Sequence, residues 1–235
     1  MKVTYIHHSG FLVETDRFYY LFDYEKGHLP KMDVTKPVFV LASHGHGDHY
    51  NPKVFSLLSD AGMQQIRAVL SEDIEVPADM TALQVSPGKK YELGAEYGPG
   101  KEVAPEYYPK LTTFTSTDLG VAFLIEEGDK LIYHAGDLND WVWEEESDSY
   151  NDQMTKDFRK QIGLLSEQLK HREIDVAFVV LDPRQGKDYD RGLCYFLESI
   201  SVKQVYPMHY WGKPDIMETF LKEHPNYKHQ IQRTE

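Results

Sequence analysis

Short apolar stretches dominate the first forty residues of the chain. Residues 2–8, 11–15 and 17–24 are rich in β-branched and aromatic side chains and are separated by Ser-Gly and Asp-Arg pairs. This pattern predicts short strands joined by turns. The same criteria predict further strands at 38–42, 66–70, 82–85, 111–115, 121–126, 130–134, 176–181 and 204–206.

Helical periodicity is clearest in the second half of the chain. The apolar residues Met154, Phe158, Ile162, Leu165 and Leu169 recur at spacings of 4, 4, 3 and 4, which predicts one buried helical face. Shorter helices are predicted at 52–58, 191–199 and 214–223. Strands first and then alternating helices and strands predict an α/β fold in a single domain over 1–235.

Three local features refine this outline. Asn51 is the predicted N-cap of the helix at 52–58, with Pro52 at its first position. Residues 86–110 are rich in Gly and Pro and are predicted to form an irregular loop or a loose hairpin. Residues 139–152 are acidic and aromatic, and we expect a surface loop or a lid.

The charge balance disfavours some classes of partner. The 38 acidic and 25 basic residues give a net charge of −13, which repels nucleic acid and anionic lipid. The longest apolar run, 176–181, is too short to cross a bilayer. Cys194 is the only cysteine and the first residues lack an apolar leader, so we expect a cytoplasmic protein without disulfides. The oligomeric state is not predicted.

The sequence SHGHGDHYNP at 43–52 carries the strongest chemical signal. His44, His46, Asp48 and His49 fall within six residues, between a predicted strand and a predicted helix. Imidazole and carboxylate suit zinc, manganese or iron. The alternative, a polar loop that is histidine-rich by chance, does not account for four ligand-type residues at such close spacing.

The H-x-H-x-D-H pattern resembles the signature of the metallo-β-lactamase superfamily. Asp23 in YLFDYEKG, Asp137 in LIYHAGD and His209 in VYPMHYW resemble further conserved elements of that family, in the same order. The pieces HHSGFLVE, HAGD and PMHY resemble the branch that contains ascorbate-6-phosphate lactonase and related metal-dependent hydrolases. The resemblance implies a four-layer αββα sandwich with metals at one edge of two sheets.

The resemblance also assigns ligands. His44 and His46 would bind a first metal ion, and Asp137 would bridge it to a second. The second ion would also be held by Asp48, His49 and His209. Asp23 would lie behind the ligands and orient one imidazole.

One ligand of the family pattern is missing. The family supplies a third histidine to the first metal between the metal loop and the bridging aspartate, yet residues 50–133 contain no histidine. Ser116, Thr117 and Asp118 lie at the expected place, and Asp118 is the best metal ligand of the three. The alternative is a simple turn in which Ser and Asp cap backbone groups.

These ligands imply hydrolysis by a metal-activated hydroxide, since divalent metals bring the pKa of bound water to about 7. Asp48 would accept or orient the proton. The expected substrate is a small ester, lactone or phosphodiester, and the expected cofactor is zinc or manganese, at one or two ions per chain. Two alternatives are an RNA-processing nuclease of the same superfamily, which the acidic charge disfavours, and a degenerate scaffold that binds ligands without turnover.

Four further residues are candidates for supporting roles. His8 is expected near the metals, and His134 is expected either near them or in a structural hydrogen bond. Arg184 follows the predicted strand at 176–181 and could bind an anionic substrate, or form a salt bridge with a nearby aspartate. Trp211, two residues after His209, could line a substrate pocket or simply pack.

The remaining candidates are expected to be inert. Cys194 lies in an apolar helical stretch, and no local residue supplies a base beside it. His28, His171, His224 and His229 match no element of the pattern and are expected at the surface.

Overall fold

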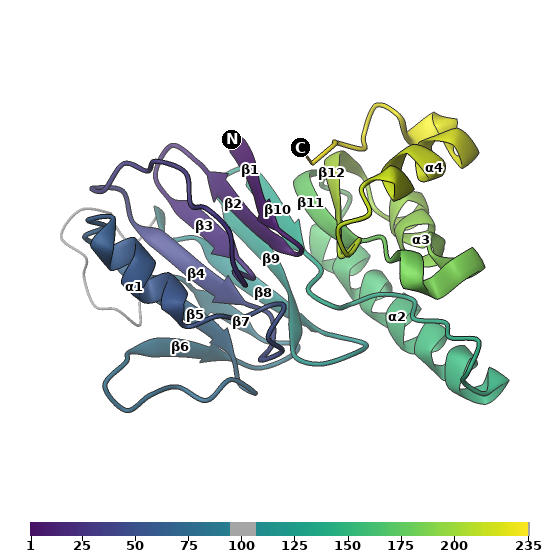
Figure 1. Cartoon of the computed structure of the whole chain (residues 1–235), viewed down its shortest axis with the longest axis horizontal. Helices are drawn as coiled ribbons and strands as arrows, with labels where there is room; N and C mark the ends of the chain where they lie inside the picture. The colour runs from purple at the N-terminus through teal and green to yellow at the C-terminus, as the bar shows by residue number, and fades with distance from the viewer. Residues whose placement is uncertain (95–106, 235) are drawn as a thin grey trace. The chain divides into compact units, whose positions relative to one another are not determined.

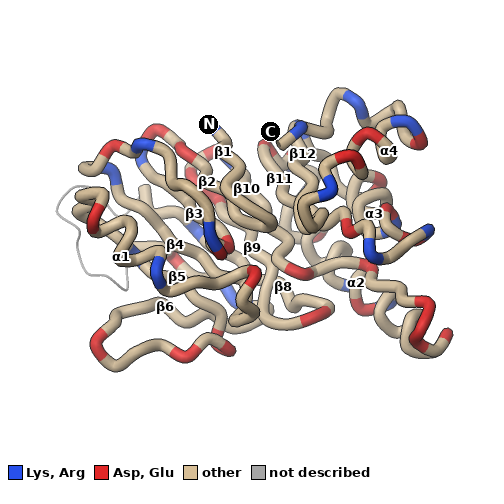
Figure 2. The backbone as a smooth tube through the Cα atoms, viewed as in Figure 1, with Lys and Arg blue, Asp and Glu red and all other residues tan. Residues whose placement is uncertain are grey.

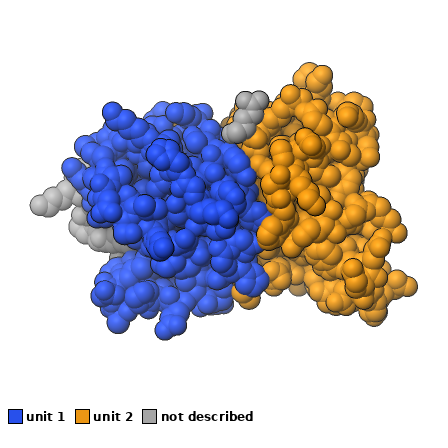
Figure 3. Space-filling view, in the orientation of Figure 1, with its two compact units in different colours: residues 1–86 blue, residues 87–235 orange. Residues whose placement is uncertain are grey.

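A computed structural model describes residues 1–94 and 107–234 of the chain. It divides the chain into two compact units, Met1–Ser86 and Pro87–Glu235 (Figure 3). Each unit carries one six-stranded sheet with helices, as expected for an α/β fold. The assignment of 1–235 to a single domain stays a prediction.

The first unit is built on a mixed sheet. Its strand order is β1-β2-β3-β4-β5-β6. The pairs from β1 to β3 are antiparallel, and those from β3 to β6 are parallel. The elements are β1 (Lys2–His7), β2 (Gly10–Glu14), β3 (Tyr19–Phe22), β4 (Val38–Ala42), α1 (Lys53–Asp60), β5 (Ile66–Ser71) and β6 (Ala82–Val85).

Helix α1 covers one face of this sheet. Val54 and Leu58 of α1 are fully buried, in one cluster with Leu21 and Val40. The start of α1 differs from the prediction: Pro52 occupies the N-cap position and makes no side-chain cap bond. Asn51 lies one residue earlier, and its side chain accepts a hydrogen bond from the Lys53 N–H at 3.1 Å, which is the kind of bond that caps the first turn of a helix.

The second unit also has a mixed sheet, of order β12-β11-β10-β9-β8-β7. Strands β10, β11 and β12 are parallel, and β7 to β10 are antiparallel. Its strands are β7 (Lys90–Glu92), β8 (Lys110–Thr115), β9 (Val121–Glu127), β10 (Lys130–His134), β11 (Ile174–Val180) and β12 (Val202–Met208). Its helices are α2 (Asp148–Leu169), α3 (Arg191–Ser199) and α4 (Asp215–Glu223), with short 3₁₀ turns at Pro183–Asp188 and Pro225–Tyr227.

One loop prediction is corrected in this unit, and for another the structure shows one of the two predicted alternatives. Helix α2 begins at Asp148 inside the segment expected to be a loop, because Ser147 caps it by accepting the Tyr150 N–H and Asp148 places a negative charge in the first turn. Within 86–110, β7 pairs antiparallel with β8, which is the hairpin alternative; residues 95–106 lie outside the described residues.

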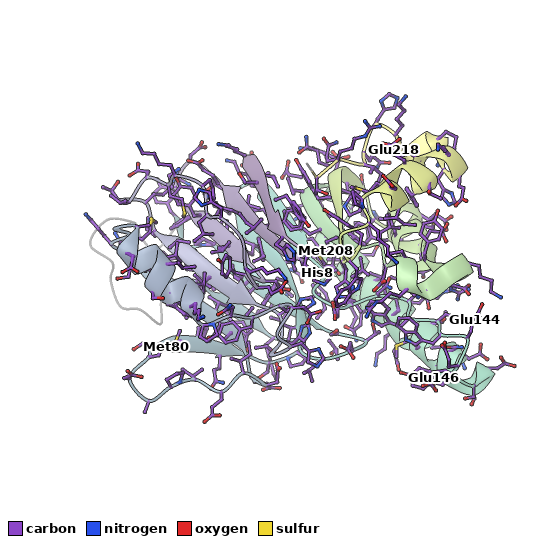
Figure 4. All side chains as sticks on the ribbon, viewed as in Figure 1. His8, Met80, Glu144, Glu146, Met208 and Glu218 are labelled. Atoms are coloured by element: carbon purple, nitrogen blue, oxygen red, sulfur yellow. The ribbon has the colours of Figure 1, made fainter. Side chains whose placement is uncertain are left out.

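The predicted apolar face of α2 is confirmed, since Phe158, Ile162, Leu165 and Leu169 are buried. Acidic residues occur in both units, and several lie near the start of α2 (Figure 2). There, the labelled Glu144 and Glu146 are exposed (Figure 4). Among the described helices, none combines the length and hydropathy needed to cross a bilayer.

Parallel pairing decides where the polar loops emerge. In the first unit, β3, β4 and β5 run parallel as neighbours, so the loops after them leave the sheet at one edge (Figure 1). In the second unit, the same holds for β10, β11 and β12. Ligand sites of α/β proteins collect at the carboxyl ends of strands, and each unit has one such edge.

Candidate metal centre

The metal loop, residues 43–52, leaves the carboxyl end of β4 and folds back on itself. His44 is fully buried and His46 is exposed. His44 Nε2 lies 3.0 Å from His46 Nδ1. Two nitrogen ligands of one tetrahedral zinc ion lie about 3.3 Å apart, from zinc–nitrogen bonds of about 2.0–2.1 Å. The pair is therefore spaced to bind one ion.

The rest of the loop turns toward the β1–β2 turn. His49 is fully buried, and its Nε2 lies 4.0 Å from Asp48 Oδ2. His8, labelled in Figure 4 at the end of the β1–β2 hairpin, places its Nε2 3.5 Å from the same oxygen. Ligand atoms of His8, Asp48 and His49 lie within 4.8 Å of one another. His8 thus lies beside two of the predicted ligands, whereas His7 pairs with Glu25 at 2.8 Å. The role of His8 stays a prediction.

Asp23 lies behind this loop and holds it. The residue follows β3 and is fully buried. Its Oδ1 accepts the Ser43 N–H at 2.7 Å, and its Oδ2 accepts the Ser43 hydroxyl at 2.7 Å. The same Oδ2 lies 2.8 Å from His49 Nδ1. A carboxylate at Nδ1 fixes the tautomer in which Nε2 carries the lone pair that binds a metal.

A second carboxylate, which is not among the residues predicted from the sequence, supports the loop. Asp73 accepts the Gly45 N–H at 2.7 Å. The residue follows the carboxyl end of β5, beside β4 in the parallel part of the sheet. An aspartate just after a predicted strand was the available signal.

In the second unit, Asp137 follows β10 and is 5% exposed. A carboxylate oxygen of Asp118 lies within 4.8 Å of a carboxylate oxygen of Asp137. Ser116 and Thr117 form hydrogen bonds to backbone groups, as in the turn that was the predicted alternative. Ser116 Oγ accepts the Asp118 N–H at 3.1 Å, and the Thr117 hydroxyl donates to the Asn139 carbonyl at 2.6 Å. These bonds fix the turn that presents the exposed Asp118 beside Asp137.

His209 follows Met208, the last residue of β12 (Figure 4). Its Nε2 lies 3.4 Å from Asp137 Oδ1, and its Nδ1 lies 2.9 Å from Asp182 Oδ2. Asp182 is fully buried after β11 and thus orients His209 as Asp23 orients His49. Burial would raise the pKa of Asp182, but hydrogen bonds from His209 and Arg184 hold that pKa at about 2. The sequence marks Asp182 only as one of two aspartates near Arg184, with Asp188, that could form a salt bridge with it.

That salt bridge is present. Arg184 Nε and Nη2 contact the Asp182 carboxylate at 2.9 and 2.6 Å, and the guanidinium lies 4.4 Å from the Trp211 ring centroid. The Trp211 indole N–H also donates to Asp182, at 3.2 Å. His209 has edge contacts with the rings of Trp141 and Trp211 at 5.7 and 5.4 Å. Contacts with Asp182 and His209 therefore explain where the side chains of Arg184 and Trp211 lie. That these two residues bind substrate stays a prediction.

His134 forms a structural hydrogen bond, which was one of the two roles predicted for it. The residue is fully buried at the end of β10, and its Nδ1 accepts the Gly136 N–H at 3.1 Å. The bond shapes the turn that carries Asp137. His134 thus supports the candidate centre through the backbone.

Backbone strain coincides with the candidate site. Non-glycine residues with positive φ cost about 1–3 kcal/mol each and persist where the surroundings enforce them. Six occur among the described residues. Four of these are predicted ligands or lie in direct contact with one: His8, Asp23, His209 and Trp211.

Each unit thus brings together its own share of the predicted residues. The first unit groups His8, Asp23, His44, His46, Asp48 and His49, and the second groups Asp118, Asp137 and His209. That both sets serve one centre stays a prediction.

Comparison with known proteins gives three kinds of match. The family model "Beta-lactamase superfamily domain" matches residues 2–152. A UPF0173 metal-dependent hydrolase of Desulforamulus reducens is 27% identical over 233 residues, covering 89% of this chain and 84% of that protein. The structure of Igni18, a metallo hydrolase of Ignicoccus hospitalis, is 16% identical and covers 99% of this chain and 94% of that one, with a TM-score of 0.64. CmlA, a diiron β-hydroxylase of Streptomyces venezuelae, is 11% identical and matches with a TM-score of 0.58, covering 98% of this chain and 52% of that one.

Proposed function

The chain belongs to the beta-lactamase superfamily, as its metal loop predicts, and on that premise we propose that it is a metal-dependent hydrolase of small esters, lactones or phosphodiesters. The match and its structural neighbours confirm the predicted superfamily and the metallo-β-lactamase fold class. The names of the relatives, a metal-dependent hydrolase and a metallo hydrolase, support the coarse activity. The substrate class is our inference from the site.

One observation carries the proposal: within each unit, imidazole and carboxylate atoms converge at the spacing of metal ligands. The closest pairs are His44 with His46 at 3.0 Å, and His209 with Asp137 at 3.4 Å. Two ligand imidazoles, of His49 and His209, are each backed by a buried aspartate. Donors oriented in this way are typical of metal sites, and oxygen and nitrogen donors without thiolate suit zinc, manganese or iron.

We assign two metal ions. His44 and His46 would hold the first, with Asp118 in place of the absent histidine. The nearness of Asp118 to Asp137 supports this replacement. Asp48, His49 and His209 would hold the second ion, and Asp137 would bridge the two. Zinc and manganese remain the expected ions.

When bound, a divalent ion lowers the pKa of its water toward about 7 and polarises the substrate oxygen. The chain's own residues then manage the proton and the substrate. Asp48 is partly exposed, with 29% of its side chain accessible, so it can accept or orient a proton from water. His8 lies 3.5 Å from Asp48 Oδ2 and is placed to hold that carboxylate in position.

The residues that we expect to contact the substrate lie in the second unit. Arg184 uses Nε and Nη2 on Asp182, but 44% of its side chain is exposed and a guanidinium has five donors. A guanidinium held in this way can still bind an anionic group of a small substrate. Trp211 is 42% exposed and offers an aromatic face beside Arg184. The net charge and the single cysteine support a small-molecule substrate and a cytoplasmic location.

A panel of hydrolysis assays tests the function. Protein loaded with zinc or manganese is given esters, lactones, a bis-aryl phosphate and single-stranded RNA. We expect turnover of at least one small substrate, lost in Asp137→Ala and retained in Asp129→Ala, which changes an exposed carboxylate on the β9–β10 turn. Equal rates in wild type and Asp137→Ala would refute the proposal, and cleavage of RNA alone would favour the nuclease.

A further inference from the structure

A second group of metal-ligand side chains lies in the second unit, built from residues that the hydrolase proposal does not use. Asp190 precedes α3, Cys194 lies one turn into it, and His224 ends α4. Cys194 Sγ lies 3.6 Å from His224 Nε2 and 3.8 Å from Asp190 Oδ2. The Asp190 oxygen and His224 Nε2 are 2.6 Å apart. Cys194 was expected to be inert and His224 to lie at the surface. His224 is partly exposed, and its contact with the Cys194 thiol was not predicted from the sequence.

The three atoms converge on one point, as the ligands of one ion do. For a tetrahedral zinc ion, sulfur and nitrogen ligands lie about 3.6 Å apart, and oxygen and nitrogen ligands about 3.3 Å apart. The two distances to sulfur match this spacing. The Asp190–His224 hydrogen bond would open by about 0.7 Å to admit the ion.

The surroundings favour a cation. His224 and Asp190 are partly accessible, with 29% and 19% of their side chains exposed, so an ion can enter and a water molecule can complete four ligands. The imidazole is held in place by the Phe220 ring, with centroids 4.8 Å apart. Glu223, next to His224 in sequence, adds negative charge near Cys194.

A catalytic cysteine does not explain the arrangement. Burial and the nearby Asp190 carboxylate raise the pKa of the Cys194 thiol to about 12, whereas a nucleophile needs a lowered pKa. The thiol and the carboxylate also contact the same nitrogen of His224. In a nucleophilic triad the carboxylate would instead hold the other nitrogen of the base.

We propose that Asp190, Cys194 and His224 form a second binding site, independent of the hydrolase centre, for one thiophilic divalent ion such as Zn²⁺. Binding replaces the thiol proton of Cys194, which passes to solvent, and the sulfur binds as thiolate. His224 Nε2 gives up the proton that it donates to Asp190 in the ion-free site, so that its lone pair can bind the ion, and the neutral imidazole carries its one proton on Nδ1. The ion would tie α3 to the end of α4.

Cobalt(II) tests the site selectively. Cys194 is the only cysteine of the chain, and the ligands proposed for the hydrolase centre are nitrogen and oxygen atoms. A thiolate-to-cobalt charge-transfer band in the near ultraviolet therefore reports this site alone. Metal-free, reduced protein is titrated with Co²⁺, and the band is followed to saturation.

We expect the band to saturate at one ion per chain and to be absent from Cys194→Ser. His224→Gln and Asp190→Asn should each weaken cobalt binding at least about tenfold, because losing even a residue behind a metal ligand typically costs about 10- to 100-fold in affinity. His229→Gln, which changes an exposed histidine nearby in sequence, should leave the binding unchanged. Circular dichroism of each variant confirms folding.

Two results would overturn the proposal: no charge-transfer band in wild type, or a band of unchanged affinity in both His224→Gln and Asp190→Asn. Asp137→Ala separates this site from the hydrolase centre. It should keep the band even though it loses hydrolysis.

Discussion

Replacing Asp23 by asparagine changes one buried atom and keeps the shape of the side chain. The amide oxygen can still accept the Ser43 N–H, which Oδ1 accepts at 2.7 Å. The amide NH₂ then faces His49 Nδ1 in place of Oδ2, which lies 2.8 Å away. A donor at that position forces Nδ1 to accept, so the proton moves to Nε2 and blocks the atom proposed to bind metal. Asparagine tolerates the positive φ of 41° at this position.

The expected loss follows from this change of tautomer. Removing a carboxylate behind a metal-bound imidazole costs about 10- to 100-fold in metal affinity, which is about 1.4–2.7 kcal/mol. Folding without metal should suffer less, because Asn keeps the Ser43 N–H bond and the Ser43 hydroxyl can rotate to accept. Asp23→Ala removes all the acceptors. It should therefore also lower the free energy of unfolding by about 1–3 kcal/mol for each buried donor left unpaired.

Competition with a zinc chelator at equilibrium measures the effect. The Cys194→Ser background removes any contribution from the second site. Glu25→Gln is the matched control, because it changes a carboxylate that also lies 2.8 Å from a histidine Nδ1, on His7 outside the ligand set. Wild-type zinc affinity in Asp23→Asn, with unchanged thermal stability, would refute the proposed role of Asp23.

Three further predictions concern single sites. Asp118→Ala should lower the metal content from two ions to one per chain, measured by elemental mass spectrometry; an unchanged content would remove Asp118 from the ligands. Arg184→Lys should raise the KM for an anionic substrate at least about tenfold, or about 1.4 kcal/mol, relative to a neutral one, because lysine cannot hold Asp182 and an anion with one planar fork; equal KM values would show that Arg184 only packs. Phe196→Ala should cost about 3–5 kcal/mol in urea unfolding, since Phe196 is 1% exposed and its ring lies 5.4 Å from that of Tyr133; a loss below about 1 kcal/mol would show that the core closes around the gap.

Local patterns predicted the elements well, because strands and helices follow residue periodicity. The apolar spacing in α2 identified its buried face, and the strand at 38–42 matches β4. The start of α2 was missed because a cap at Ser147, not hydrophobicity, decides it. The capping bond predicted for Asn51 is present, although α1 itself begins one residue later than predicted, at Lys53.

The candidate site was predicted where its ligands cluster in sequence. His44 through His49 lie in one loop and could be recognised together. Asp73, Asp182 and the pairing of Cys194 with His224 depend on contacts between segments far apart in the chain. Only the parallel order of the strands, or the packing of α3 near the end of α4, brings these residues together. Periodicity in one segment carries no information about such pairings.

Metal content per chain tests the central claim most directly. Elemental mass spectrometry on Cys194→Ser protein, purified without chelator and loaded with zinc or manganese, counts the ions held by the imidazole and carboxylate sets alone. The account predicts two ions per chain in this protein and fewer in Asp137→Ala. A protein that binds no ion, even with either metal in excess, would contradict the account. That result would favour the alternative of a non-catalytic scaffold.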